Sequence, residues 1–123
     1  PAEAMKWFRK AAAQGEPNAQ FSLGLRYVRG EGVPKDFAKA SQWFKRAAEQ
    51  GHAEAQRSLG RRHAAGEGVP QNRAEALKWY LVAAALGDGE SKVLSTKLTP
   101  TMSPAEVADA MVAAARFVPK ARF

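Results

Sequence analysis

The side chains that could do chemistry in this chain are few and scattered. Cysteine is absent, which excludes disulfides, thiolate metal ligands and a cysteine nucleophile. His52 and His63 show no carboxylate–histidine spacing typical of a metal site, so we expect them to cap a helix or pack in the core. Catalysis needs a nucleophile with a base, or a paired acid and base. The carboxylates in loops or at helix starts have no such partner; they are Glu31, Glu67, Asp88 and Glu90. The residues predict no catalytic site, cofactor or metal site.

Two further patterns resemble binding motifs. The run Gly-Glu-Gly at 30–32 could suggest a phosphate-binding loop, but it lacks the following Gly-Lys-Ser/Thr and no strand precedes it. The same run recurs at 66–68, which favours a turn between helices. Trp7, Trp43 and Trp79 could form a stacking platform for bases. Their equal spacing and their alanine neighbours favour core packing instead, and we expect Trp43 to be buried between units.

These patterns belong to an internal repeat with a period of 36 residues. Residues 15–50 overlay residues 51–86 without gaps at 17 identical positions, where unrelated sequences would give roughly two or three. Each unit predicts two helices joined by a Gly-Glu-Gly-Val-Pro loop. Asp36 and Asn72 are good N-caps for the second helices. We expect Gly51 to end its helix in a left-handed conformation.

The repeat breaks after residue 87, and the last helix has a different character. Ser103, Pro104 and Glu106 form a strong helix start, and a terminal cap is what a stacked array requires. Its predicted apolar face comprises Val107, Met111, Ala114 and Val118. The predicted helices are 1–14, 17–29, 36–50, 53–65, 72–86, 88–98 and 103–118. We divide the chain into a repeat array at 1–98, with a partial first unit, two full units and half a third, and a capping helix with its tail at 99–123.

The repeated pattern resembles a known family. It reads Ala19-x3-Leu23-Gly24-x2-Tyr27-x2-Gly30-x-Gly32-Val33, then Ala40-x2-Trp43-Phe44-x2-Ala47-Ala48-x2-Gly51-x-Ala53. This is similar to the Sel-one-like repeat (SLR), a relative of the tetratricopeptide repeats, although His63 replaces Tyr27 in the second copy. The resemblance implies an all-α fold, a right-handed α/α solenoid of antiparallel helix pairs. It also implies a non-enzymatic scaffold that binds a protein or peptide.

The C-terminal end is also similar to bacterial SLR proteins that act in polar localisation or development, some with a periplasmic repeat region. The chain opens at Pro1 directly in helical sequence, so we expect a fragment of a larger bacterial protein, periplasmic or cytoplasmic according to the sequence upstream. The chain itself contains no apolar run long enough for a membrane span.

Charge favours an acidic partner. Lysine and arginine total 19 against 12 acidic residues, a net charge of +7. The alternative function is binding of nucleic acid or another polyanion through this basic surface. Such a protein should concentrate its cations on one stripe, whereas here they occur on both helices of each unit.

The candidate binding residues follow from an analogy with related two-helix repeats, in which the first helix of each unit lines the concave groove. The groove positions are Asn18, Phe21, Leu25, Val28, Arg57, Arg61, Val93 and Lys97, with Glu54 and Lys92 in the same rows. Phe21, Leu25 and Val28 form an apolar stripe that the second unit does not share. They could anchor a hydrophobic peptide with acidic flanks beside the arginines. The alternative is that this stripe contacts a neighbouring repeat.

Overall fold

The computed structural model describes residues 2–120, and within them it contains seven α-helices, one 3₁₀ helix and no strand. The helices are α1 (Ala2–Ala13), α2 (Pro17–Arg29), α3 (Phe37–Glu49), α4 (Ala53–Ala65), α5 (Arg73–Ala85), α6 (Gly89–Leu98) and α7 (Pro104–Arg116), with the 3₁₀ helix η1 at Thr99–Thr101. All seven predicted helices are present, and each boundary lies within two residues of its prediction. None of these helices has the length and apolarity that a membrane crossing requires.

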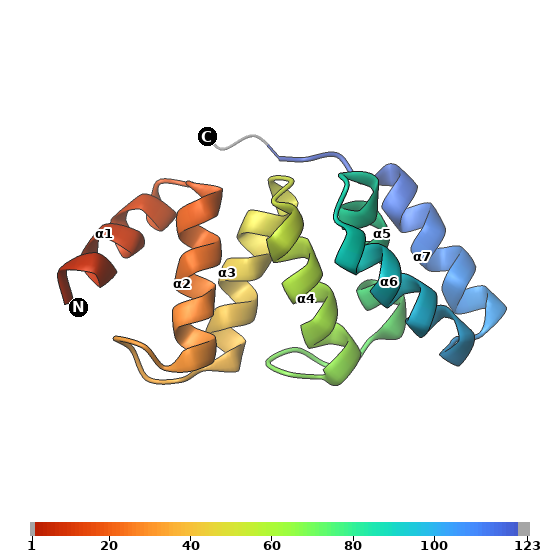
Figure 1. Ribbon diagram of the computed structural model, residues 1–123, viewed down its shortest axis with the longest axis horizontal. Coiled ribbons are helices and arrows are strands. Elements are labelled where there is room, and N and C mark those ends of the chain that lie inside the picture. The colour runs from red at the N-terminus through yellow and green to blue at the C-terminus, as the bar shows by residue number, and fades with distance from the viewer. Residues whose placement is uncertain (1, 121–123) are drawn as a thin grey trace.

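Successive helices run in opposite directions and form one elongated array from α1 to α7 (Figure 1). Within the array α2 packs against α3, and α4 packs against α5. Helix α5 also packs against α6 and α7, so α7 closes the last unit. The predicted all-α solenoid of antiparallel helix pairs is confirmed.

The helix ends follow from local chemistry. The side chains of Asp36 and Asn72 accept the backbone N–H groups of Lys39 and Glu75, each at 3.0 Å. These bonds satisfy N–H groups that the first turn of a helix leaves without an intrahelical partner. Gly51 follows α3 with a φ of +93°, as predicted, in a region that residues with a side chain rarely adopt.

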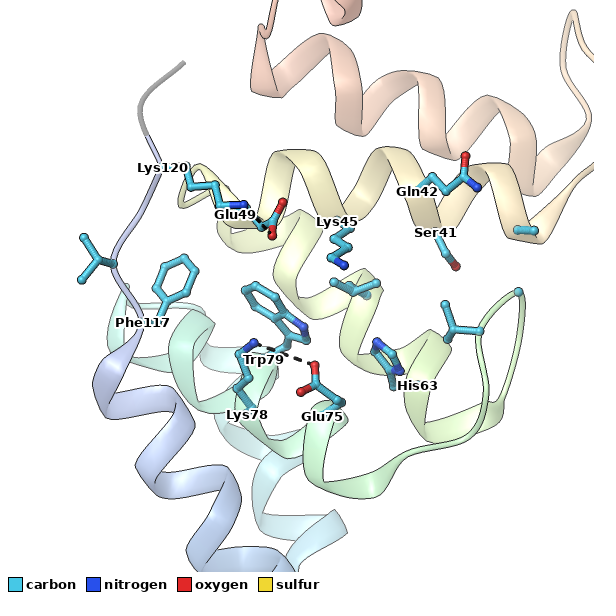
Figure 2. Close-up of a pocket in the computed structure, with 15 residues that line it drawn as sticks. Ser41, Gln42, Lys45, Glu49, His63, Glu75, Lys78, Trp79, Phe117 and Lys120 are labelled. Carbon is cyan, nitrogen blue, oxygen red and sulfur yellow. Dashed lines mark hydrogen bonds and ion pairs between the residues drawn. The ribbon is translucent and has the colours of Figure 1, made fainter. Parts of the chain in front are cut away.

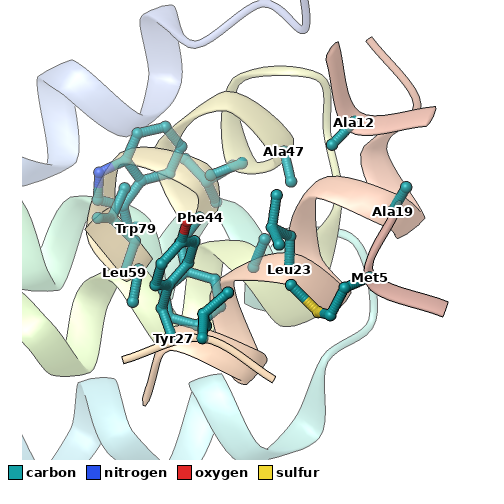
Figure 3. Packing of buried hydrophobic residues seen from close by; sticks show 14 residues of the cluster. Met5, Ala12, Ala19, Leu23, Tyr27, Phe44, Ala47, Leu59 and Trp79 are labelled. Carbon is teal, nitrogen blue, oxygen red and sulfur yellow. The ribbon is translucent and has the colours of Figure 1, made fainter. Parts of the chain in front are cut away.

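The Leu-Gly pair of each unit has a packing role. A Cβ atom at Gly24 would lie 2.6 Å from the ring of Phe44, and one at Gly60 would lie 2.6 Å from the ring of Tyr80. The glycines therefore let an aromatic ring of the second helix rest directly on the backbone of the first helix. Phe44 is fully buried among Leu23, Leu59 and their neighbours, at the centre of the core (Figure 3).

The three tryptophans do not share one environment, so the prediction that they form a buried ladder is wrong in part. Trp79 is 3% exposed, Trp43 is only half-buried, and Trp7 is 62% exposed. Phe117, the residue that follows α7, contributes to the burial of Trp79, because its ring packs edge-on against the indole at 5.4 Å between centroids. The ring of Trp43 instead has the guanidinium of Arg46 over it at 4.7 Å. The repeat fixes the position of each tryptophan, and its neighbours decide how far it is buried.

The capping helix also differs from its prediction at two residues. Met111 is 58% exposed and Val118 is 76% exposed, so neither belongs to a buried face. Helix α7 turns Ala110 fully inward and leaves Val107 and Ala114 half-buried. Val118 lies beyond the helix, in an extended segment after Arg116. Pro119 accounts for this end, because proline donates no N–H and disfavours helical backbone in the residue before it.

Candidate functional site

The predicted groove residues lie on the first helices of the units, α2, α4 and α6, which follow one another along the array (Figure 1). We call this surface the first-helix face. Helix α2 carries Asn18, Phe21, Leu25 and Val28; α4 carries Arg57 and Arg61; α6 carries Val93 and Lys97.

The apolar stripe on α2 contacts its own chain. The ring of Phe21 lies 5.7 Å from that of Phe44 and 4.8 Å from the imidazole of His52, between centroids. Leu25 and Val28 are half-buried against the core. Part of this stripe therefore joins neighbouring repeats, and its remaining surface is open to solvent.

Two of the three arginines of α4, Arg57 and Arg61, are bound by carboxylates at the start of α6. Arg57 donates to Asp88 at 2.7 Å and lies 3.3 Å from Glu90, while Arg61 also pairs with Glu90. Burial alone would raise the pKa of Asp88. Hydrogen bonds from Ser91, then the charge and hydrogen bond of Arg57, outweigh burial and leave the pKa of Asp88 below its usual value. This cluster links α4 to α6.

His52 has the capping role that the sequence predicts. Its Nδ1 accepts the N–H of Ala55 at 3.1 Å, and its Nε2 lies 3.0 Å from the side-chain oxygen of Asn18. The neutral imidazole with hydrogen on Nε2 satisfies both contacts. Burial lowers the pKa of His52, and the carboxylates of Glu54 and Glu16 offset only part of that effect. His52 thus joins α4 to the preceding unit.

The part of the first-helix face on α6 is exposed to solvent. Val93 is 52% exposed, and Lys97 is exposed with no ion-pair partner in the part of the chain that the structure describes. Both side chains lie on α6, one turn apart. Among the predicted binding residues, these two side chains make the fewest contacts with the rest of the described chain.

A second feature was not predicted: a cleft of about 740 Å³ between the second helices, α3 and α5 (Figure 2). Leu59 and His63 of α4 line it, with Trp79 on α5. The segment 117–120 lies at one end and the loop around Gly68 belongs to its lining. The sequence did contain a signal for it, because the second unit has the smaller His63 where the first unit has Tyr27.

The described residues contain no group of three or more histidines, aspartates and glutamates that could hold a metal ion. The arrangement on both faces is one of apolar surface, paired charges and a few unpaired donors, which suits binding of another chain.

The fold is that of a helical-repeat solenoid, and its repeats match a known protein family. The family model for the Sel1 repeat matches residues 1–16, 17–52 and 53–88. The chain belongs to the Sel1 repeat family. Proteins of this family are generally non-enzymatic protein-interaction modules.

Two solved structures are similar to this chain. One is a protective antigen of uropathogenic Escherichia coli strains with an SLR fold, at 32% identity and a TM-score of 0.91 over 98% of this chain. This chain spans only 26% of that antigen. The other is a Sel1 repeat protein from Oxalobacter formigenes, at 42% identity and a TM-score of 0.76 over 77% of this chain and 71% of that one. No curated protein matches the sequence.

Proposed function

We propose that this chain is a non-enzymatic interaction module that holds a segment of another protein against its first-helix face. The observation that carries the proposal is the exposed pair Val93 and Lys97 on α6, an apolar side chain beside a cation that no carboxylate of the described residues neutralises. The half-buried Leu25 and Val28 offer further apolar contact on α2. Arg61 keeps half of its side chain exposed and could exchange Glu90 for an acidic partner.

Nothing in the structure favours the polyanion alternative. Many of the arginines that would bind phosphates already bind carboxylates of the chain itself, as Arg26 binds Glu31 and Arg62 binds Glu67. Phosphate binding by these arginines would require each ion pair to open.

The test is selection of peptides from a random display library on the immobilised protein, followed by affinity measurement with two double variants. Val93→Asp with Lys97→Glu changes the first-helix face. Val112→Asp with Lys6→Glu makes the same changes on exposed residues of α7 and α1. We expect the first double variant to weaken binding about tenfold or more, and the second to leave it unchanged.

Two results would contradict the proposal. One is equal affinity for both double variants, which would place the peptides elsewhere. The other is a steep linear fall of log affinity with log salt for arbitrary RNA, which would make the chain a polyanion binder.

A further inference from the structure

Two residues that line the cleft between α3 and α5 differ from the residues 36 positions earlier in the chain. At the earlier positions Met5 and Tyr27 are buried members of the core (Figure 3). Thirty-six residues later these positions hold Ser41 and His63, which are smaller and polar. Both line the cleft, so open space with polar and apolar lining lies here, whereas the side chains 36 residues earlier are buried in the core.

Hydrogen-bond donors without an acceptor surround this space. The indole of Trp79 lines the cleft, and its N–H finds no acceptor among the described residues. His63 has a buried Nδ1 with no hydrogen-bond partner. In Figure 2 the ammonium of Lys45 points between α3 and α5 toward the same space as these two rings. The indole N–H of Trp79 and the ammonium of Lys45 are therefore unpaired donors on the lining of the cleft, and an acceptor from outside the chain could bind both of them.

The charged side chains that line the cleft carry one positive charge more than negative charges. Lys78 pairs with Glu75 at 3.8 Å, and Lys120 pairs with Glu49 at 3.1 Å. Lys45 has no ion-pair partner in the described residues, so the lining has three lysines against two glutamates. The cleft is complementary to one negative charge, which a carboxylate would supply as an acceptor of two or more hydrogen bonds.

The chain's own tail shows that the rim of the cleft accepts extended backbone. Phe117 leaves α7 with extended dihedral angles and packs against Trp79. The backbone N–H of Lys120 donates to the carbonyl oxygen of Glu49 at 2.7 Å. An extended segment is therefore held across one end by an aromatic contact and a main-chain hydrogen bond.

We propose that the cleft between α3 and α5 binds an extended segment of another protein through one aspartate or glutamate side chain. Lys45 and the Trp79 indole N–H bind the carboxylate, the His63 ring lines the space beside it, and Leu59 and Val69 contact its apolar neighbours. The site lies on the second helices, so it goes beyond the function proposed for the first-helix face and does not depend on it.

The experiment is a titration of the ¹⁵N-labelled protein with the short capped peptide Val-Ala-Glu-Ala-Val and with its glutamine counterpart. The reporter is the indole N–H resonance of Trp79, assigned with Trp79→Phe. We expect the glutamate peptide to shift this resonance in a saturable way, and the glutamine peptide to bind about tenfold more weakly. Lys45→Gln should reduce affinity for the glutamate peptide about tenfold, while Lys92→Gln, an exposed lysine of α6 outside the cleft, should match the parent.

A second variant keeps the test independent of that lysine. Ser41→Met with His63→Tyr introduces the side chains found 36 residues earlier, at Met5 and Tyr27. These larger side chains should fill the cleft and abolish the shift of the Trp79 resonance. An unmoved Trp79 resonance, equal affinity for the two peptides, or parental affinity in Lys45→Gln would each overturn the proposal. Peptides selected on the first-helix face should still bind the filled variant, so failure here is distinguishable from failure of the proposed function.

Discussion

The junctions before and after the second full unit, which we call the first and second junctions, are held together by different interactions. At the first junction the ring of Phe21 stacks on the imidazole of His52, 4.8 Å away. At the second junction the same two repeat positions hold Arg57 and Asp88, which form an ion pair at 2.7 Å. The residues differ between the copies, but each has changed together with the residue it faces.

A difference between repeats does not by itself mark a residue that binds a partner. A side chain that varies from copy to copy looks free to bind a partner, as Phe21 and Arg57 do in the sequence. Here Phe21 and Arg57 each contact a matching residue at the start of the next unit, and each pair joins adjacent units. Val93 and Lys97 vary without such a neighbour in the described residues, so they carry the proposed contact.

The largest expected effect is a difference in lost stability between truncation of Trp79 and truncation of Trp43. Trp79→Ala should cost about 3–5 kcal/mol, as other truncations of large buried side chains do. Trp43→Ala should cost clearly less, because its ring is only half-buried and less surface returns to water. Urea unfolding of the two variants measures both losses. An equal or larger loss at Trp43 would show that the deeper burial of Trp79 does not set the difference.

A smaller effect should appear when the second junction is converted into the first. Arg57→Phe leaves Asp88 without its cation, and Asp88→His places an imidazole against Arg57, so each alone should cost about 1–3 kcal/mol. The double variant recreates the Phe21–His52 pair, and a histidine can cap α6 as His52 caps α4. We expect it to regain about 1 kcal/mol or more over the sum of the single losses, measured by a double-mutant cycle. Simple additivity would mean that the junction residues act independently.

The sequence predicted what depends on local chemistry. The capping residues Asp36 and Asn72 and the positive φ of Gly51 each follow from the residue itself and its neighbours in the chain. The period of 36 residues then places the helix pairs, because similar units form similar helices at the same spacing.

The contacts across junctions could not be predicted in this way. Arg57 meets Asp88 from 31 residues away, and the spacing along one helix does not tell which residue of the next unit lies opposite. The cleft depends on the combined volumes of Ser41, His63 and Trp79, which come from three different helices. The cleft therefore results from packing between helices. The sequence shows only the exchanges of Met5 for Ser41 and of Tyr27 for His63 at the repeat period.

The smallest effect should be a pH dependence confined to the first junction. Folding lowers the pKa of His52 through burial, so the folded state favours the neutral imidazole, which caps α4 and bonds Asn18. The stability from His52 is complete above the unfolded value of 6.5 and is lost as the pH falls toward the lower folded pKa. The melting temperature of the parent should therefore drop more between pH 7 and pH 5 than that of His52→Asn, whose uncharged side chain also caps helices. His63 is present in both proteins, so the difference between them isolates His52. If the melting temperatures of the parent and of His52→Asn fell in parallel with pH, protonation of His52 would not contribute to the stability of the first junction. The first and second junctions would then differ only in packing.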